Sequence, residues 1–137
     1  GHPVAAAAAL AVVREILERD LVAQVNERGA YLEAELKRRF AQHPHVGDIR
    51  GRGLFWGVEF VADRQTKEPF DPSLGLAAKL KKVTFAQGLI CYPMPGTRDG
   101  RVGDHVLLAP PFIASELELS QALDILDKAI ESTLPHC

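Results

Sequence analysis

Two consecutive prolines, Pro110-Pro111, directly follow a short apolar run, Val106 to Ala109. A short apolar run that is bounded in this way is typical of a buried strand. Proline has no amide hydrogen to donate to a ladder, so it occurs at strand ends, edges or bulges. The strand is therefore expected to stop at Ala109, with the apolar pair Phe112-Ile113 behind it.

The length and composition predict one ordinary soluble domain with a sizeable core. The chain has 137 residues, of which 47% are hydrophobic and 25% are charged. Its formal net charge is −2, so the composition gives no indication of the positively charged surface that binds nucleic acid. The short basic runs Lys37-Arg38-Arg39 and Lys79 to Lys82 are interpreted as solvated helix faces.

Cysteine and histidine are too sparse to predict a disulfide framework or a metal site. The two cysteines, Cys91 and Cys137, favour a reducing, cytoplasmic compartment. His43-Pro44-His45 has no acidic or thiol partner at ligand spacing, so a proline-containing turn is favoured over a metal site.

The first helix is expected to run from Pro3 through Ile16-Leu17, because proline suits the first turn of a helix. Its stretch from Val4 to Val13 is apolar on every side, which indicates a helix buried all round. That stretch is too short to cross a bilayer and lacks the basic flank of a signal peptide. We therefore expect it to face a missing domain, a second subunit or both, and the absence of an initial Met favours the same interpretation.

A second helix is predicted after Asp20. Its apolar residues recur at three- and four-residue spacing on one face, at Val22, Val25, Gly29, Leu32, Leu36 and Phe40. Glycine costs a helix about 1 kcal/mol relative to alanine. Gly29 therefore indicates the close approach of a neighbouring element.

Two strands follow a turn at His43 to Gly47. They are predicted at Val46 to Arg50 and at Leu54 to Val61, joined by Gly51-Arg52-Gly53. These glycines precede a strand and do not link a strand to a helix, so a hairpin turn is favoured over a nucleotide-binding loop. The second strand has the period of a half-buried strand, in which Leu54, Trp56, Val58 and Phe60 alternate with Phe55, Gly57, Glu59 and Val61.

A polar, proline-bearing stretch, Ala62 to Pro72, predicts a surface loop. The helix after it is expected at Ser73 to Gln87, with Gly88 as its C-terminal stop. A last helix begins at Ser115, which forms a capping box with Glu118. The inward stripe of this helix is Leu119, Leu123, Leu126 and Ile130.

Two further short strands are predicted, at Leu89 to Tyr92 and at Val106 to Ala109. Pro93 to Gly103 lies between them and is rich in glycine, proline and charge, so it is expected to be a loop. Together the elements favour an α+β fold, a small antiparallel sheet of three to four strands with helices packed on one face.

The residue order suggests no Ser/His/Asp or Cys/His catalytic arrangement, and no lysine lies in an apolar, pocket-like stretch. The best chemical candidates are Arg98 and Arg101, in the loop expected beside the end of the Pro110-Pro111 strand. A guanidinium there could bind a carboxylate through two hydrogen bonds. The alternative is that both arginines are solvated loop charges.

Three motifs occur in order across essentially the whole chain: "GHPVAAAAALAVV" at the start, "GDIRGRGLFWGVEF" in the middle and "GDHVLLAPPFIASELEL" near the end. Together they closely resemble the C-terminal part of class III aminotransferases, pyridoxal-phosphate (PLP) enzymes of fold type I. The resemblance implies that residues 1–137 form a small C-terminal domain. Such a domain lies over the active-site cleft, helps shape the substrate pocket and helps build a homodimer.

The resemblance also implies what the chain lacks. In the family, a large domain upstream of the Gly1-His2-Pro3 motif carries the Schiff-base lysine, the Asp at the pyridine nitrogen and a Thr at the cofactor phosphate. This chain is therefore expected to bind no cofactor, to contain no catalytic residue and to be inactive alone. The whole enzyme would transfer an amino group from an amine or ω-amino acid to a keto acid by a ping-pong reaction.

The resemblance also implies substrate contacts, but this chain departs from the family pattern at one position. Many members have a carboxylate-binding arginine in the strand before the two prolines, where this chain has Leu107. Some members that use amines or ω-amino acids place a mobile arginine after a strand similar to Gly88-Leu89-Ile90-Cys91. Here that strand runs into Tyr92, so the expected substrate contacts are Arg101, then Arg98, together with Tyr92.

Two alternatives stay open. A decarboxylating or mutase relative would share these motifs. A stand-alone binding or oligomerisation module would keep the fold without the chemistry. A start codon just upstream of Gly1 would favour the module, and a long upstream open frame would favour the enzyme.

Overall fold

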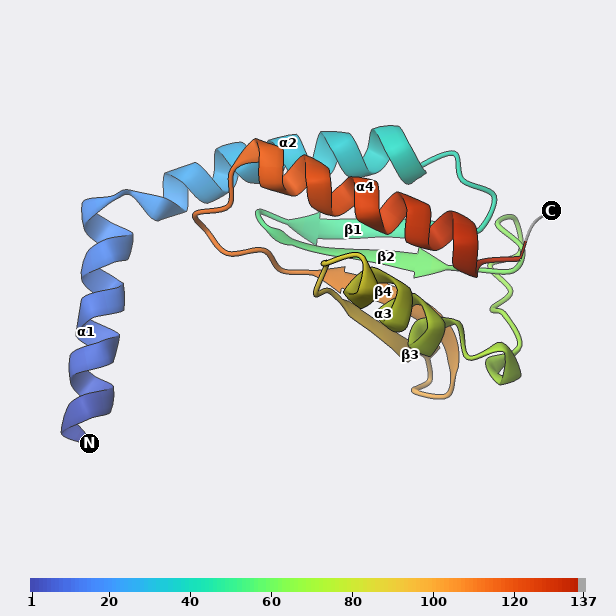
Figure 1. Ribbon diagram of the computed structural model, residues 1–137, viewed down its shortest axis with the longest axis horizontal. Coiled ribbons are helices and arrows are strands. Elements are labelled where there is room, and N and C mark those ends of the chain that lie inside the picture. The colour runs from blue at the N-terminus through green and yellow to red at the C-terminus, as the bar shows by residue number, and fades with distance from the viewer. Residues whose placement is uncertain (136–137) are drawn as a thin grey trace.

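The computed structural model describes residues 1–135, so Cys137 lies outside the described residues. Three helices, α2 (Leu21–Phe40), α3 (Leu76–Ala86) and α4 (Glu116–Thr133), pack on a sheet, whereas α1 (Pro3–Glu18) extends away from it (Figure 1). The strands are β1 (Val46–Arg52), β2 (Phe55–Phe60), β3 (Tyr92–Arg98) and β4 (Val102–Leu108). All neighbouring strands are antiparallel, in the order β1-β2-β4-β3. The predicted α+β architecture is confirmed.

The core lies between the sheet and α2, α3 and α4. Leu54, Trp56, Val58 and Phe60 are buried as the alternation predicts, and Phe55 on the opposite face is 58% exposed. Val61 was expected on that opposite face but is 2% exposed, because β2 ends at Phe60 and the alternation stops there. The four predicted leucine and isoleucine side chains of α4 are buried in the same core. The capping box is present at the start of α4 and satisfies amides that would otherwise lack a partner.

Helix α1 differs from its prediction. None of its residues is buried, and Val4 and Leu17 are 70% and 73% exposed. Asp20 has a left-handed backbone conformation (φ 47°), and there the chain turns from α1 into α2. Within residues 1–135 no helix is long and apolar enough to cross a membrane. A helix buried all round is thus wrong for this chain by itself, and the further protein expected over α1 stays a prediction.

Helix α2 presses against the turn between β1 and β2. A Cβ atom on Gly29 would lie 2.6 Å from the Cα and carbonyl oxygen of Gly53, so only glycine fits there. The predicted close approach at Gly29 is confirmed. Val22 was expected on the inward face but is 60% exposed, and Leu21 is buried in its place.

The third strand and the loop after it were predicted wrongly. Leu89 to Cys91 is not a strand, and most of the expected loop, Pro93 to Gly103, belongs to the β3–β4 hairpin. Pro93 and Pro95 are tolerated because β3 is an edge strand, where a missing amide hydrogen need not break a ladder on both sides.

Helix α3 begins later than predicted, at Leu76 and not at Ser73, because Pro72–Leu74 forms a short 3-10 turn. Its start is capped from another strand. The buried carboxylate of Asp104 on β4 accepts a hydrogen bond of 3.1 Å from the amide of Ala77. This bond supplies a partner for one of the free amides of the first helical turn.

Candidate functional site

The face of the sheet opposite the helices is the best candidate for a functional surface. Cross-strand pairing places Arg50, Gly57, Leu107 and Tyr92 in one row across the four strands. In the part of the chain that the structure describes, no helix covers this face, and Tyr92 is 54% exposed. We call it the open face and define it by the side chains of Arg50, Phe55, Glu59, Tyr92, His105 and Leu107.

One end of the open face is polar, and its charges are already paired. Arg50 Nη1 donates to Glu59 Oε2 at 2.8 Å and to Asp48 Oδ2 at 2.6 Å. These bonds, first that to Glu59, raise the pKa of Arg50. Thr97 Oγ1 and His105 Nδ1 are 2.9 Å apart on the wall of the same hollow, which has a volume of about 450 Å³. This end can hold polar groups, and the Arg50 guanidinium there already contacts two carboxylates through Nη1.

The other end of the open face is apolar. Phe55, Ile90, Tyr92 and Leu107 line a hollow of about 340 Å³ beside the end of β4. Cys91 also borders it, and its Sγ lies 3.6 Å from Thr84 Oγ1. Burial raises the pKa of the Cys91 thiol, so it is not an activated nucleophile. This end can contact apolar groups and exclude water.

The structure separates the predicted substrate contacts. Tyr92 pairs with Leu107 near the prolines, whereas Arg98 pairs with Val102 at the far end of the hairpin. Six strand steps of about 3.3 Å put roughly 20 Å between Tyr92 and Arg98. The expectation that the arginines lie beside the proline end of β4 is therefore wrong, because Pro93 to Arg98 continues as a strand.

Arg98 and Arg101 flank a turn that leaves them free to bind another group. Both are exposed, and within residues 1–135 neither guanidinium has a hydrogen-bond or ion-pair partner. The turn between them has positive φ at Asp99 (56°) and Gly100 (68°). Arg101 and Lys81 line a hollow of about 360 Å³ at the start of α3.

Sequence reasoning missed Arg50, Glu59 and His105. The alternation of β2 does put Glu59 on the outward face, and that signal was available. The positions of Arg50 and His105 depend on strand register, in which Glu59 pairs with Asp48 on one side and His105 on the other. Register between distant strands has no local sequence signature.

Comparison with known proteins agrees with this architecture. Residues 1–130 match the profile of the aminotransferase class-III family. An uncharacterised aminotransferase of Schizosaccharomyces pombe is 48% identical over 134 residues, which is 97% of this chain and 29% of that protein. A diaminobutyrate–2-oxoglutarate transaminase of Halomonas elongata is 33% identical and is matched over 95% of this chain and 26% of its own length.

Solved transaminase structures contain the same fold. An (S)-enantioselective ω-transaminase from Thermomicrobium roseum superposes with a TM-score of 0.88 at 36% identity, covering 98% of this chain and 28% of that one. An ω-transferase of Vibrio fluvialis JS17 gives 0.86 at 32% identity, with 97% and 30% covered. The chain thus spans less than a third of these relatives. Since the profile match covers nearly all its residues and the likeness extends to the fold, the chain belongs to the class III aminotransferase family.

Proposed function

We propose that residues 1–137 act as the small C-terminal domain of a PLP-dependent class III aminotransferase. The open face would lie toward the substrate cleft, and α1 would contact the large domain and a second subunit. The observation that carries this proposal is that the open face and α1 are both uncovered in a chain that spans 26–30% of the length of its relatives. A helix with several exposed apolar side chains is typical of a surface that other protein covers.

The residues of this chain do not fit a covalently held PLP. A Schiff-base lysine needs a pocket that removes its amine from water. Every lysine here is exposed. Lys37 pairs with Glu33 at 2.5 Å, and Lys67 donates to the carbonyl of Gly47 at 2.6 Å. The cofactor of the whole enzyme would therefore be held outside this chain, and structures of a Vibrio fluvialis aminotransferase are described as PLP-bound and PMP-bound.

The substrate class of the whole enzyme is proposed as an amine or ω-amino acid with a keto acid acceptor. Relatives include a gamma aminobutyrate transaminase of Solanum lycopersicum, 34% identical, as well as the diaminobutyrate enzyme. A leucine/methionine racemase of Thermococcus litoralis is 35% identical, so amino-group transfer is not the family's sole reaction. Racemisation without a keto acid acceptor would overturn the substrate proposal.

Titration of this chain with PLP tests the domain proposal. After borohydride reduction, intact-mass analysis should show no stoichiometric adduct, because no lysine is placed in a desolvating pocket. A transaminase that contains its own Schiff-base lysine serves as the positive control. A single lysine labelled near one-to-one would show that this chain holds its own cofactor site and would contradict the proposal.

The free guanidinium groups are proposed as the carboxylate contact of the whole enzyme, first Arg101 and then Arg98. Replacing both with alanine should raise KM for the keto acid about tenfold, because a charge-assisted hydrogen bond to the carboxylate is lost. Lys128→Ala, at an exposed position on α4, is the matched control. An unchanged KM in the double variant would refute the role of the two arginines.

A further inference from the structure

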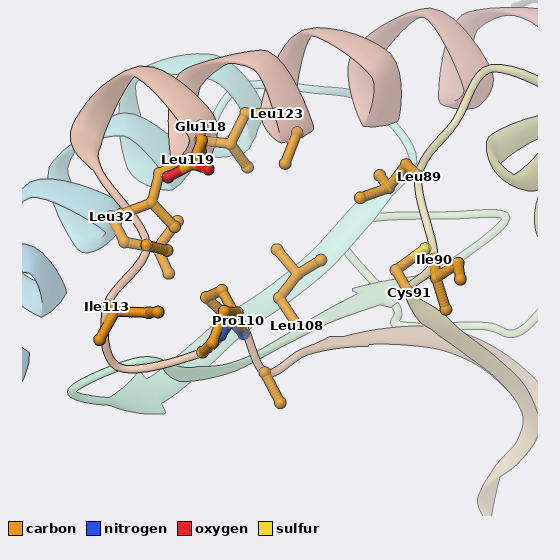
Figure 2. A pocket seen from close by; sticks show the side chains of 14 residues that line it. Leu32, Leu89, Ile90, Cys91, Leu108, Pro110, Ile113, Glu118, Leu119 and Leu123 are labelled. Carbon is orange, nitrogen blue, oxygen red and sulfur yellow. The ribbon is translucent and has the colours of Figure 1, made fainter. Parts of the chain in front are cut away.

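The two ends of helix α4 differ in how fully the core is closed. At the first turns of the helix an apolar groove stays open beside Pro110, and Ile113, which lines it, is 56% exposed (Figure 2). At the last turn of the helix, Ile130 is fully buried and lies beside residues 43–46, the connection from α2 to β1. We call residues 43–46 the histidine turn. The closed end of the core depends on how this turn is held.

Two hydrogen bonds define the histidine turn. The amide of Val46 donates to the carbonyl of His43 at 3.1 Å, which closes a four-residue turn with Pro44 at its second position. The amide of His45 donates to Nδ1 of the His43 imidazole at 3.1 Å. Asparagine and aspartate at the first position of a turn usually accept this second bond with a side-chain oxygen. His43 supplies a nitrogen in place of that oxygen, and the nitrogen can take up a proton near neutral pH.

The two imidazoles of the histidine turn respond differently to a proton. Nδ1 of His43 accepts from an N–H group, so it is unprotonated and the hydrogen of the neutral ring is on Nε2. Nδ1 of His45 lies 3.1 Å from the carbonyl oxygen of Val61, so it holds a hydrogen and donates. Protonation of His45 keeps that donor. Protonation of His43 removes the acceptor and sets two N–H groups against each other, so His43 is the pH-sensitive member of the pair.

Charged groups of both signs surround His43. Two carboxylates come from α4, and two cations of the loop after β2 donate to backbone carbonyls just outside the turn; these groups are Asp127, Glu131, Arg64 and Lys67. Burial of the ring, first, and the neighbouring His45 lower the pKa of His43, and together they outweigh the attraction of the two carboxylates. The fold therefore favours the neutral ring.

We propose that the histidine turn is a pH-sensitive latch between α2 and β1, which is closed while His43 is neutral and opens when its Nδ1 gains a proton. Opening releases the amide of His45, whose carbonyl accepts a hydrogen bond of 2.9 Å from the amide of Val61 at the end of β2. The His45 ring centre also lies 5.0 Å from that of Phe70, so the change extends to the loop before α3. The latch needs no cofactor or substrate, so it does not depend on the proposed transaminase function.

Acid should open the latch as the pH falls below about 6.5, the ordinary pKa of histidine. Because the pKa of His43 is lower in the folded chain, the unfolded chain binds more protons, so this stability is complete above that pH and is lost below it. His43→Asn is the informative variant, since its side-chain oxygen can accept from the His45 amide at any pH. From about pH 7.5 to pH 5, the unfolding equilibrium constant should rise about threefold or more beyond the rise in His43→Asn.

Urea unfolding followed by circular dichroism at the two pH values gives these constants. His2→Asn, at an exposed histidine outside the turn, is the matched control and should behave like the original chain. An equal pH dependence in the original chain and in His43→Asn would overturn the proposal. A smaller pH dependence in the original chain would also overturn it, because protonated His43 would then be stabilised by Asp127 and Glu131.

NMR on the ¹⁵N-labelled original chain tests the hydrogen bond itself and stands even if His43→Asn fails to fold. Nδ1 of His43 should be the unprotonated ring nitrogen at neutral pH. The amide signal of His45 should follow the titration of the His43 ring, with a midpoint below about 6.5. A hydrogen on His43 Nδ1 at neutral pH, or a His45 amide that does not follow His43, would refute the latch.

Discussion

Replacing Gly29 with alanine is expected to lower the free energy of unfolding by about 3 kcal/mol, as overpacking does in a tight interface. The new Cβ would lie 2.6 Å from two backbone atoms of Gly53, and backbone atoms cannot rotate away as a flexible side chain can. Helix α2 or the β1–β2 turn would have to move. Helix propensity alone predicts the opposite, a gain of about 1 kcal/mol. Urea unfolding followed by circular dichroism measures the sign directly.

The control for Gly29→Ala is the reverse substitution at the next residue. Ala30 is exposed on the same helix, so Ala30→Gly should cost only the propensity difference of about 1 kcal/mol. If Gly29→Ala were instead more stable than the original chain, the contact between α2 and the β1–β2 turn would be looser than the structure shows.

Replacing Trp56 with alanine should lower the free energy of unfolding by about 3–5 kcal/mol. Trp56 is 3% exposed and packs in the core between the sheet and the helices. Its indole nitrogen also donates a hydrogen bond of 2.7 Å to the carbonyl of Gly53. Trp56 is the chain's one tryptophan, so the comparison needs circular dichroism and not tryptophan fluorescence.

Trp56→Phe separates packing from hydrogen bonding. It keeps an aromatic ring and loses the indole donor, so a smaller loss of about 1–2 kcal/mol is expected. If Trp56→Ala and Trp56→Phe lowered the free energy of unfolding equally, the filling of core volume by the ring would not be the main contribution of Trp56 to stability. Because Trp56 and Gly29 both contact Gly53, the double variant should depart from additivity by about 1 kcal/mol.

The candidate site was predicted in part. The outward position of Phe55 and Glu59 follows from the alternation of β2, and the close approach at Gly29 follows from a glycine where a helix would favour alanine. The prediction that Arg98 and Arg101 lie near Tyr92 was wrong. The sequence around Pro93 and Pro95 favours a loop. These prolines are compatible with a strand only because β3 lies at the edge of the sheet.

The sequence by itself determined the elements whose cause is local. The capping box at Ser115, the period of β2 and the abrupt stop at Pro110 each depend on residues within a few positions of one another. The three motifs likewise indicated the family before any fold was known. These features are readable because side-chain periodicity and proline geometry act over short distances along the chain.

Only the tertiary structure decided which distant residues meet. Strand order placed β3 at the edge, and register brought Arg50 and His105 to either side of β2. Asp104 caps a helix that begins 28 residues before it, at Leu76. The apolar groove beside Pro110 is lined by segments that are far apart in the sequence. Such contacts arise from packing between segments far apart in the chain, and local sequence patterns do not predict that packing.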